Sequence, residues 1–235
     1  MLYIGSCRYM HGYGWHSFPG RLHTTKEIIL FLENIDDIKN VVNNNPSNLT
    51  NMIFGDIHHP EVIYTSNSFI DNIKNIKNIK KIILEISSRK ICYYRDTPIN
   101  YHYYNYYCSY DESLKKYDLK LHQLSDDEID KDLDYIKLLA KKIFNEDIEI
   151  HVIPHLNLKI KSTNDYIEER NKFVILLENL CETKNIKVHD VGKYIESIDG
   201  ESFLEDYMPD STHYIKDDKV TDDEVRKYLI ERIHD

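Results

Sequence analysis

The chain lacks the hallmarks of several protein classes. Lysine and arginine total 30 against 40 aspartates and glutamates in 235 residues, so the formal net charge is -10. Because nucleic-acid binding needs a basic surface, this balance argues against a general nucleic-acid partner. No apolar run approaches the roughly 20 residues that span a membrane, and the N-terminus lacks a signal peptide's basic start and long apolar stretch. We therefore expect a soluble, cytoplasmic protein with no membrane partner.

Paired cysteines and nucleotide-binding loops are also missing. The four cysteines, Cys7, Cys92, Cys108 and Cys181, include no CxxC pair. This spacing argues against a zinc knot or a disulfide framework and suits free thiols in a reducing compartment. No GxGxxG or GxxxxGK[ST] loop follows a predicted strand, which disfavours a nucleotide-dependent transferase. His58 and His59 are adjacent, but consecutive side chains diverge and no third ligand is nearby, so we expect no metal site.

Apolar patterns alternate between strand and helix along the chain. A length of 235 residues with 41% hydrophobic side chains can build a proper core, and we expect one domain spanning residues 1–235. Strands are predicted at residues 1–4, 82–86, 148–154 and 186–190, and helices start after Thr24 or Thr25, at Ser125, at Asn164 and at Thr221. This alternation predicts a three-layer α/β/α sandwich with a central, mainly parallel sheet.

Residues at about 92–124 interrupt this alternation with a tyrosine-dense insertion. Tyrosine has an apolar body and a polar tip, so such a cluster can line a sugar or nucleotide site, cover a cleft or mediate oligomerisation. A homo-oligomer is therefore compatible with the sequence. Composition drift from codon bias explains the same tyrosines equally well, and both interpretations stay open.

Two short motifs near opposite ends of the chain carry the candidate chemistry. The Gly-Ser-Cys-Arg segment at residues 5–8 follows the first strand, where a parallel strand delivers a reactive side chain to the carboxyl edge of its sheet. Asp210 stands three residues before His213, ahead of the last helix, and such a carboxylate can orient the imidazole towards a nucleophile. A buried structural cysteine and an ordinary loop histidine are the competing explanations. Together the two motifs favour a catalytic site that contains Cys7.

The arrangement resembles the SGNH/GDSL hydrolase superfamily, in which a Gly-Asp-Ser block follows the first strand and an Asp-x-x-His block lies near the C-terminus. Gly5, Ser6 and Cys7 stand where Gly-Asp-Ser would be, as in the cysteine-bearing, GSCFA-type and polysaccharide-biosynthesis relatives that are proposed to be acyltransferases. The resemblance implies an SGNH-like fold with a flavodoxin-like strand order. It also implies that Cys7 is the nucleophile, His213 the general base and Asp210 its orienting partner.

The family's Gly-x-Asn-Asp block, which supplies an oxyanion-hole asparagine, is absent from this chain. Ser88 falls at the corresponding place after the strand at 82–86, and the backbone amide of Cys7 is another donor candidate. The candidates for the oxyanion hole and for substrate binding are Ser6, Arg8, Ser88, Arg89, His155 and Asn157. Arg21, His23 and Arg170 are further candidates for an anionic substrate, although a single residue of this kind more often forms a surface ion pair.

Acyl transfer is the reaction that we expect from these residues. His213 takes the thiol proton of Cys7, the thiolate attacks an ester or thioester carbonyl, and water or a sugar hydroxyl then accepts the acyl group. The expected substrate is a small-molecule or glycan acyl ester, with no required cofactor, acyl-CoA as a possible co-substrate and no metal. The alternative, supported by the missing asparagine block, is a catalytically inactive binding module that recognises a glycan or a protein partner.

Overall fold

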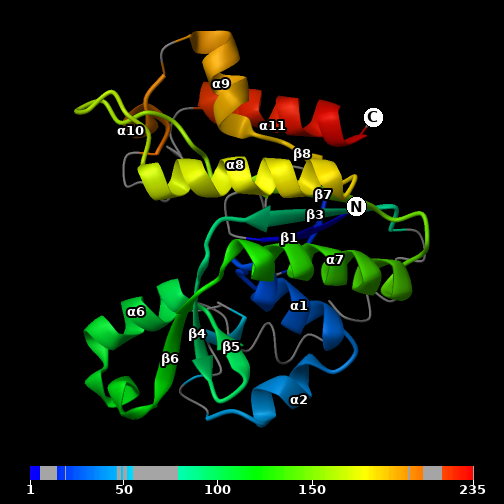
Figure 1. Ribbon diagram of the computed structural model, residues 1–235, viewed down its shortest axis with the longest axis vertical. Coiled ribbons are helices and arrows are strands. Elements are labelled where there is room, and N and C mark those ends of the chain that lie inside the picture. The colour runs from blue at the N-terminus through cyan, green and yellow to red at the C-terminus, as the bar shows by residue number, and fades with distance from the viewer. Residues whose placement is uncertain are drawn as a thin grey trace.

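A five-stranded parallel sheet forms the centre of the molecule (Figure 1). The computed structural model describes residues 1–5, 15–18, 20–46, 49, 52–54, 79–200, 202–208 and 219–234. The sheet consists of β1 (Leu2–Ile4), β2 (His16–Ser17), β3 (Lys81–Ile86), β7 (Glu149–Pro154) and β8 (Lys187–Val188). Their spatial order is β2-β1-β3-β7-β8, with all neighbours parallel. Counted along the chain, this is the flavodoxin-like order second-first-third-fourth-fifth, as expected.

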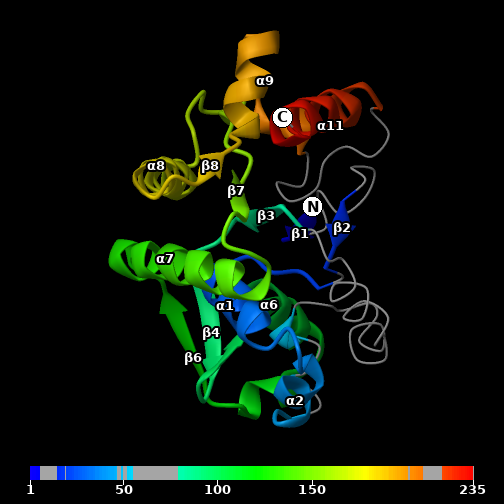
Figure 2. The same cartoon turned by 90° about the vertical axis from the view of Figure 1, so that its right-hand side faces the viewer.

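Helices cover both faces of the sheet, which confirms the three-layer α/β/α fold (Figure 2). One face carries α1 (Thr25–Glu33), α7 (Asp126–Ile143) and α8 (Glu168–Thr183), and the other carries α9 (Val191–Asp199), α10 (Leu204–Tyr207) and α11 (Lys219–His234). Alternate strand residues serve the two faces, because successive side chains of a strand point in opposite directions. Leu2 and Ile4 join the cluster beneath α1, whereas Tyr3 joins the cluster beneath α11.

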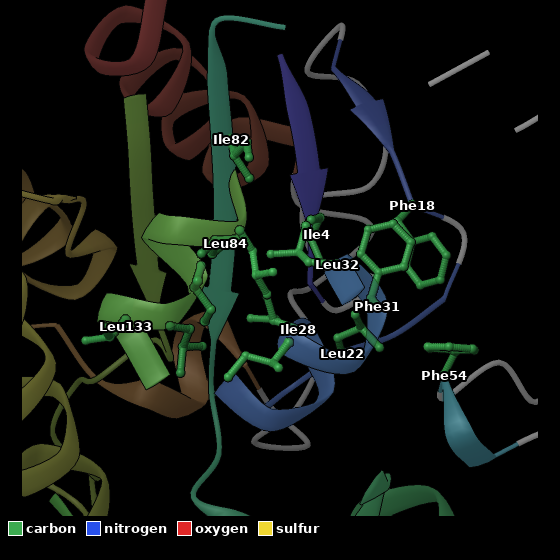
Figure 3. Close-up of a cluster of buried hydrophobic side chains, with 14 of the residues drawn as sticks. Ile4, Phe18, Leu22, Ile28, Phe31, Leu32, Phe54, Ile82, Leu84 and Leu133 are labelled. Carbon is green, nitrogen blue, oxygen red and sulfur yellow. The ribbon is translucent and has the colours of Figure 1, made fainter. Parts of the chain in front are cut away.

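The cluster on the α1 face is drawn in Figure 3. Side chains from β1 and β3 meet side chains of α1 and α7 there, including the buried Ile4, Ile82, Leu84, Ile28, Phe31, Leu32 and Leu133. Phe18, which follows β2, packs on Phe31 with ring centroids 4.2 Å apart. Full burial of each such side chain contributes about 1.5–3 kcal/mol. This face therefore fixes α1 and α7 against the strands whose ends carry the candidate site.

The helices α1 and α7 both begin with a capping box. Thr24 caps α1 and accepts a hydrogen bond from the Glu27 amide, while the Glu27 carboxylate accepts one from the Thr24 amide. Ser125 and Glu128 repeat this capping box at the start of α7. The predicted starts of both helices are thus confirmed, because a capping box is a local signal.

The tyrosine-rich stretch forms a small sheet of its own. The strands β4 (Lys90–Tyr94), β5 (Thr97–Ile99) and β6 (Leu119–Gln123) pair antiparallel in the order β5-β4-β6, and α6 (Tyr101–Tyr110) and a short 3₁₀ helix (Glu112–Lys116) connect β5 to β6. Ile91, Cys92 and Ile99 are buried in the same cluster as α1 and α7, so this sheet is packed onto the main body. The sequence predicted an insertion here without revealing its strands.

One further helix, α2 (Ile38–Asn43), follows α1, and two elements already described, β8 and α9, differ from the sequence-based prediction. The last strand is shorter than expected, because Asp190 caps α9 by accepting a hydrogen bond from the Lys193 amide. The helix α9 was not predicted, although this capping aspartate is its sequence signal. Among the residues that the structure places, every helix is too short or too polar to cross a membrane.

Candidate functional site

The predicted catalytic residues fall outside the described residues. These are Cys7, Asp210 and His213, together with the binding candidates Ser6 and Arg8. The structure describes the chain on both sides of the two motifs, and it describes the remaining candidates at the strand ends. The geometry of the site is therefore built from these neighbours.

Gly5, the residue directly after β1, lies in a tightly packed place. A Cβ atom at Gly5 would lie 2.5 Å from the Glu85 Cβ and 2.6 Å from the Tyr3 hydroxyl. That hydroxyl donates a hydrogen bond of 2.6 Å to Glu85 Oε2, and both side chains are fully buried. The carboxyl end of β1 is therefore held against β3, two positions before Cys7 in the sequence.

Alanine at Gly5 is expected to lower the free energy of unfolding by about 1–3 kcal/mol, the usual cost of forcing an extra carbon into a packed interior. The new methyl group would have to displace Tyr3 or Glu85 at the end of β1. Urea denaturation of the Gly5→Ala variant measures the effect. An unchanged denaturation midpoint would mean that the strand end moves freely enough to admit a side chain.

The chain that leads to Asp210 is anchored beyond the carboxyl end of β7. The Leu204 amide donates a hydrogen bond of 2.7 Å to the carbonyl of Lys159, in the segment that follows β7. Leu204 and Met208 are buried in one apolar cluster with Tyr3 of β1. In Figure 1, α10 lies on the left, the side to which the arrow of β3 points. The described residues before the second motif thus share a cluster with the strand that precedes the first.

Two serines follow β3, and their surroundings differ. Ser88 is only 7% exposed, and its hydroxyl accepts a hydrogen bond of 3.0 Å from the Lys90 amide. Ser87 is partly exposed, and its Oγ lies 2.9 Å from Nδ1 of His23. The amides of both serines donate hydrogen bonds of 3.0 Å to the His23 carbonyl. The Ser88 hydroxyl is thus engaged in a local turn, whereas the Ser87 hydroxyl is joined to an imidazole.

Sequence reasoning singled out Ser88 and did not single out Ser87. It included His23 only as one of several cationic candidates. Beyond the end of a strand, the alternation of side chains no longer tells which of two consecutive serines faces the site. The contact between Ser87 and His23 joins residues far apart in the chain, so no local pattern announces it.

Arg89 has structural partners. Its Nε donates a hydrogen bond of 2.8 Å to the Leu124 carbonyl, and its guanidinium lies 2.6 Å from Asp126. These contacts hold the end of β3 to the first turn of α7. They place the Arg89 guanidinium among the groups that support the fold.

His155 and Asn157 follow β7, the strand next to β3. His155 is partly exposed, and its Nδ1 lies 3.0 Å from the Leu156 carbonyl oxygen. Asn157 is 8% exposed and donates a hydrogen bond of 2.8 Å to Asn171, while its Oδ1 has no hydrogen-bond partner within the described part of the chain. A buried acceptor without a partner costs about 1–3 kcal/mol, so Asn157 is a group that a ligand's donor would satisfy.

Glu27 connects the chain before α1 to the tyrosine-rich stretch. Its Oε2 accepts hydrogen bonds from the amides of His23 and Thr24 and from the Thr24 hydroxyl, at 3.2, 3.0 and 2.8 Å. Its Oε1 accepts one of 2.7 Å from the Asn100 side chain. Burial raises the pKa of Glu27 to about 7, against the lowering effect of these hydrogen bonds. This carboxylate therefore holds the backbone of His23 in position.

The first turn of α6 also approaches His23. The ring of His102 lies 5.3 Å from that of His23, and the ring of Tyr103 lies 6.5 Å away. Arg21 donates a hydrogen bond of 2.7 Å to the Tyr103 hydroxyl. The tyrosine-rich stretch thus contributes side chains beside the end of β3.

Two buried histidines pair beneath α11. Nδ1 of His151, in β7, lies 2.8 Å from Nε2 of His189, directly after β8, and the rings stack with centroids 5.1 Å apart. Burial lowers the pKa of each imidazole to about 4. The neighbouring cations Lys81 and Lys187 contribute to this lowering of both pKa values, and Glu149 opposes it at His151. Both rings are therefore neutral at neutral pH.

This histidine pair predicts an acid-sensitive fold. The pKa of each ring is about 4 in the folded protein, below the usual 6.5, so the unfolded chain binds more protons between these values and acidification favours unfolding. When the pH falls from 7 to 5, the free energy of unfolding of the parent is expected to drop by about 2–4 kcal/mol more than that of a His151→Gln/His189→Gln variant. Urea denaturation at both pH values tests this. The raised pKa of Glu27 makes acidification favour the folded state at that group. Both proteins contain Glu27, so its contribution cancels in the comparison. Parallel pH dependences would contradict the prediction.

Two of the described cysteines, Cys92 and Cys181, are poor nucleophiles. Burial raises the pKa of Cys92 to about 11 and that of Cys181 to about 12, so both remain protonated thiols at neutral pH. Cys108, on α6, is partly exposed. In the part of the chain that the structure covers, no group of three or more histidine, cysteine or acidic side chains could hold a metal ion.

Comparison of the chain with protein-family models, with curated proteins and with solved structures finds no match in any of the three. The function is therefore argued from the chain's own motifs and from the geometry of its strand ends.

Proposed function

We propose that this protein is an acyl ester or thioester hydrolase or acyltransferase that uses Cys7 as its nucleophile. His213 is the general base, and Asp210 orients its imidazole. The observation that carries the proposal is the anchoring of α10 beyond the carboxyl end of β7, in one cluster with Tyr3 of β1. It supports the proposal because described residues just before each motif belong to the same apolar cluster.

Cysteine chemistry suits this position. Parallel strands of an open α/β sheet deliver ligand-binding residues at their carboxyl ends, and Cys7 follows β1 there in the sequence. An unperturbed thiol with a pKa of about 8.5 needs only modest activation by an imidazole. The raised pKa values of Cys92 and Cys181 disfavour these two thiols as alternatives.

The reaction proceeds through a thioester. His213 removes the thiol proton, and sulfur attacks the acyl carbonyl. The tetrahedral intermediate expels the alcohol or thiol leaving group, which takes the proton back from His213. Water or a sugar hydroxyl then attacks the thioester, with His213 again accepting the proton. The Cys7 thiolate leaves and takes this proton back, which releases the acyl product and regenerates the free thiol. The acyl donor is a small-molecule or glycan ester or an acyl-CoA, and the acceptor decides between hydrolysis and transfer.

Trapping of the acyl-enzyme tests the proposal. The protein is mixed with p-nitrophenyl acetate or acetyl-CoA and quenched in acid, and its intact mass is measured. At least one donor is expected to add a single acetyl group to the parent protein and none to Cys7→Ala, while Cys108→Ala, a matched loss of another thiol, is acetylated normally. If neither donor acetylates Cys7 while Cys7→Ala binds glycans as the parent does, the binding-module alternative replaces the enzyme.

A further inference from the structure

The junction between β1 and β3 is where this sheet is expected to bind its substrate. In the order β2-β1-β3-β7-β8, the sequence reverses direction at the pair β1–β3. The strand β2, which follows β1 in sequence, lies on one side of this pair, and β7 and β8, which follow β3, lie on the other side. Open α/β sheets bind their ligands at such a switch in strand order, beyond the carboxyl ends of the two strands. Gly5 ends one side of this junction, and Ser87 begins the other.

Ser87 and Ser88, which follow β3, provide four hydrogen-bond donors: two backbone amides and two side-chain hydroxyls. The amides of Ser87 and Ser88 are both bonded to the His23 carbonyl, and the Ser88 hydroxyl is bonded to the backbone of Lys90. The Ser87 hydroxyl has one hydrogen-bond partner among the described residues, Nδ1 of His23 at 2.9 Å. A hydroxyl offers one proton and two lone pairs, so it can accept from the imidazole N–H and still donate its own proton. Of these four donors, only the Ser87 hydroxyl has capacity left.

We infer that the Ser87 hydroxyl, held by His23, is the oxyanion donor that the missing Gly-x-Asn-Asp block leaves unassigned; this inference rests on the proposed function. Attack of the Cys7 thiolate moves the carbonyl π electrons onto oxygen. The Ser87 O–H hydrogen-bonds this oxygen without transferring its proton, and the bond weakens again when the leaving group departs. Ser87 is then a catalytic residue, and His23 is a positioning residue.

The surroundings of His23 provide the rigidity that such a donor needs. Its amide is bonded to the buried carboxylate of Glu27, and its carbonyl accepts from two amides after β3. A donor fixed before charge develops stabilises the transition state without reorganisation in the rate-determining step. Asn157, in the segment that follows β7, has an Oδ1 without a partner among the described residues and is a second polar group beyond the strand ends that a bound substrate would satisfy.

Paired serine variants test the inference. With p-nitrophenyl acetate, Ser87→Ala is expected to lower kcat by about 10²–10³-fold with little change in KM, as for loss of one oxyanion-hole donor. Ser87→Thr keeps the hydroxyl and is expected to recover most of the rate. Ser88→Ala, the matched control, is expected to leave kcat unchanged and to reduce only stability. His23→Gln is expected to lower kcat less than Ser87→Ala does, again without raising KM.

The outcomes separate this inference from the proposed function. Equal kcat values for Ser87→Ala and Ser88→Ala, with Cys7→Ala inactive, overturn the role of Ser87 and leave the cysteine enzyme intact. Full activity of Cys7→Ala overturns the proposed function itself. Peptide mapping of the trapped enzyme gives a third readout, since acetyl on Ser87 would make this serine a nucleophile and overturn its assignment as a donor.

Discussion

Alanine in place of Cys7 is expected to lower kcat for p-nitrophenyl acetate by about 10³-fold or more, since on the proposed mechanism no other group can form the acyl intermediate. His213→Ala is expected to cause a loss of similar size, because on the proposed mechanism His213 acts in both steps: it takes the Cys7 thiol proton and later activates the water or hydroxyl that releases the acyl group. The double variant is expected to be no slower than either single variant. Residues that act as one unit lose their joint contribution when either is removed.

Steady-state kinetics of the parent, both single variants and the double variant make up this test. Cys108→Ala controls for the loss of a thiol as such and is expected to keep the parental rate. Losses that multiply in the double variant would contradict the mechanism, because they would mean that Cys7 and His213 contribute independently.

Alanine in place of Glu27 is expected to lower the free energy of unfolding by about 3–5 kcal/mol. The change leaves buried donors of His23, Thr24 and Asn100 without their acceptor, and each orphaned donor costs about 1–3 kcal/mol. Urea denaturation at pH 8, above the pKa of about 7 that burial gives Glu27, measures the loss with this carboxyl ionised.

Glu128 supplies a matched control for Glu27. It occupies the same position in the capping box of α7, but its side chain is 35% exposed, so water can replace the lost acceptor. Glu128→Ala is therefore expected to cost only about 1 kcal/mol. If Glu27→Ala and Glu128→Ala lowered the free energy of unfolding equally, burial of the Glu27 carboxylate would add nothing to the stability that an exposed capping box provides.

The tyrosine-rich stretch is attached to the chain around the start of α1. Asn100 bonds Glu27, and Tyr103 accepts a hydrogen bond from Arg21, so the start of α6 is fastened to the chain just before α1. This attachment places His102 beside His23.

Local signals in the sequence determined most of the central fold. The apolar run of β3 and the capping residues Thr24 and Ser125 predicted a buried strand and two helix starts, because periodicity and caps act over a few neighbouring residues. The alternation of these elements was enough to predict a three-layer sandwich. The antiparallel sheet of the tyrosine-rich stretch was missed, since its strands are short and their pairing depends on partners distant in the chain.

Contacts between distant residues decided the rest. The sequence by itself marked Cys7 and the Asp-x-x-His motif as candidate chemistry, because those residue types stand beside predictable strand and helix ends. Only the tertiary structure distinguished Ser87 from Ser88, buried the capping carboxylate of Glu27 and paired His151 with His189. Burial and hydrogen bonding of a side chain depend on which segments the fold packs together, and no pattern within one segment specifies that packing.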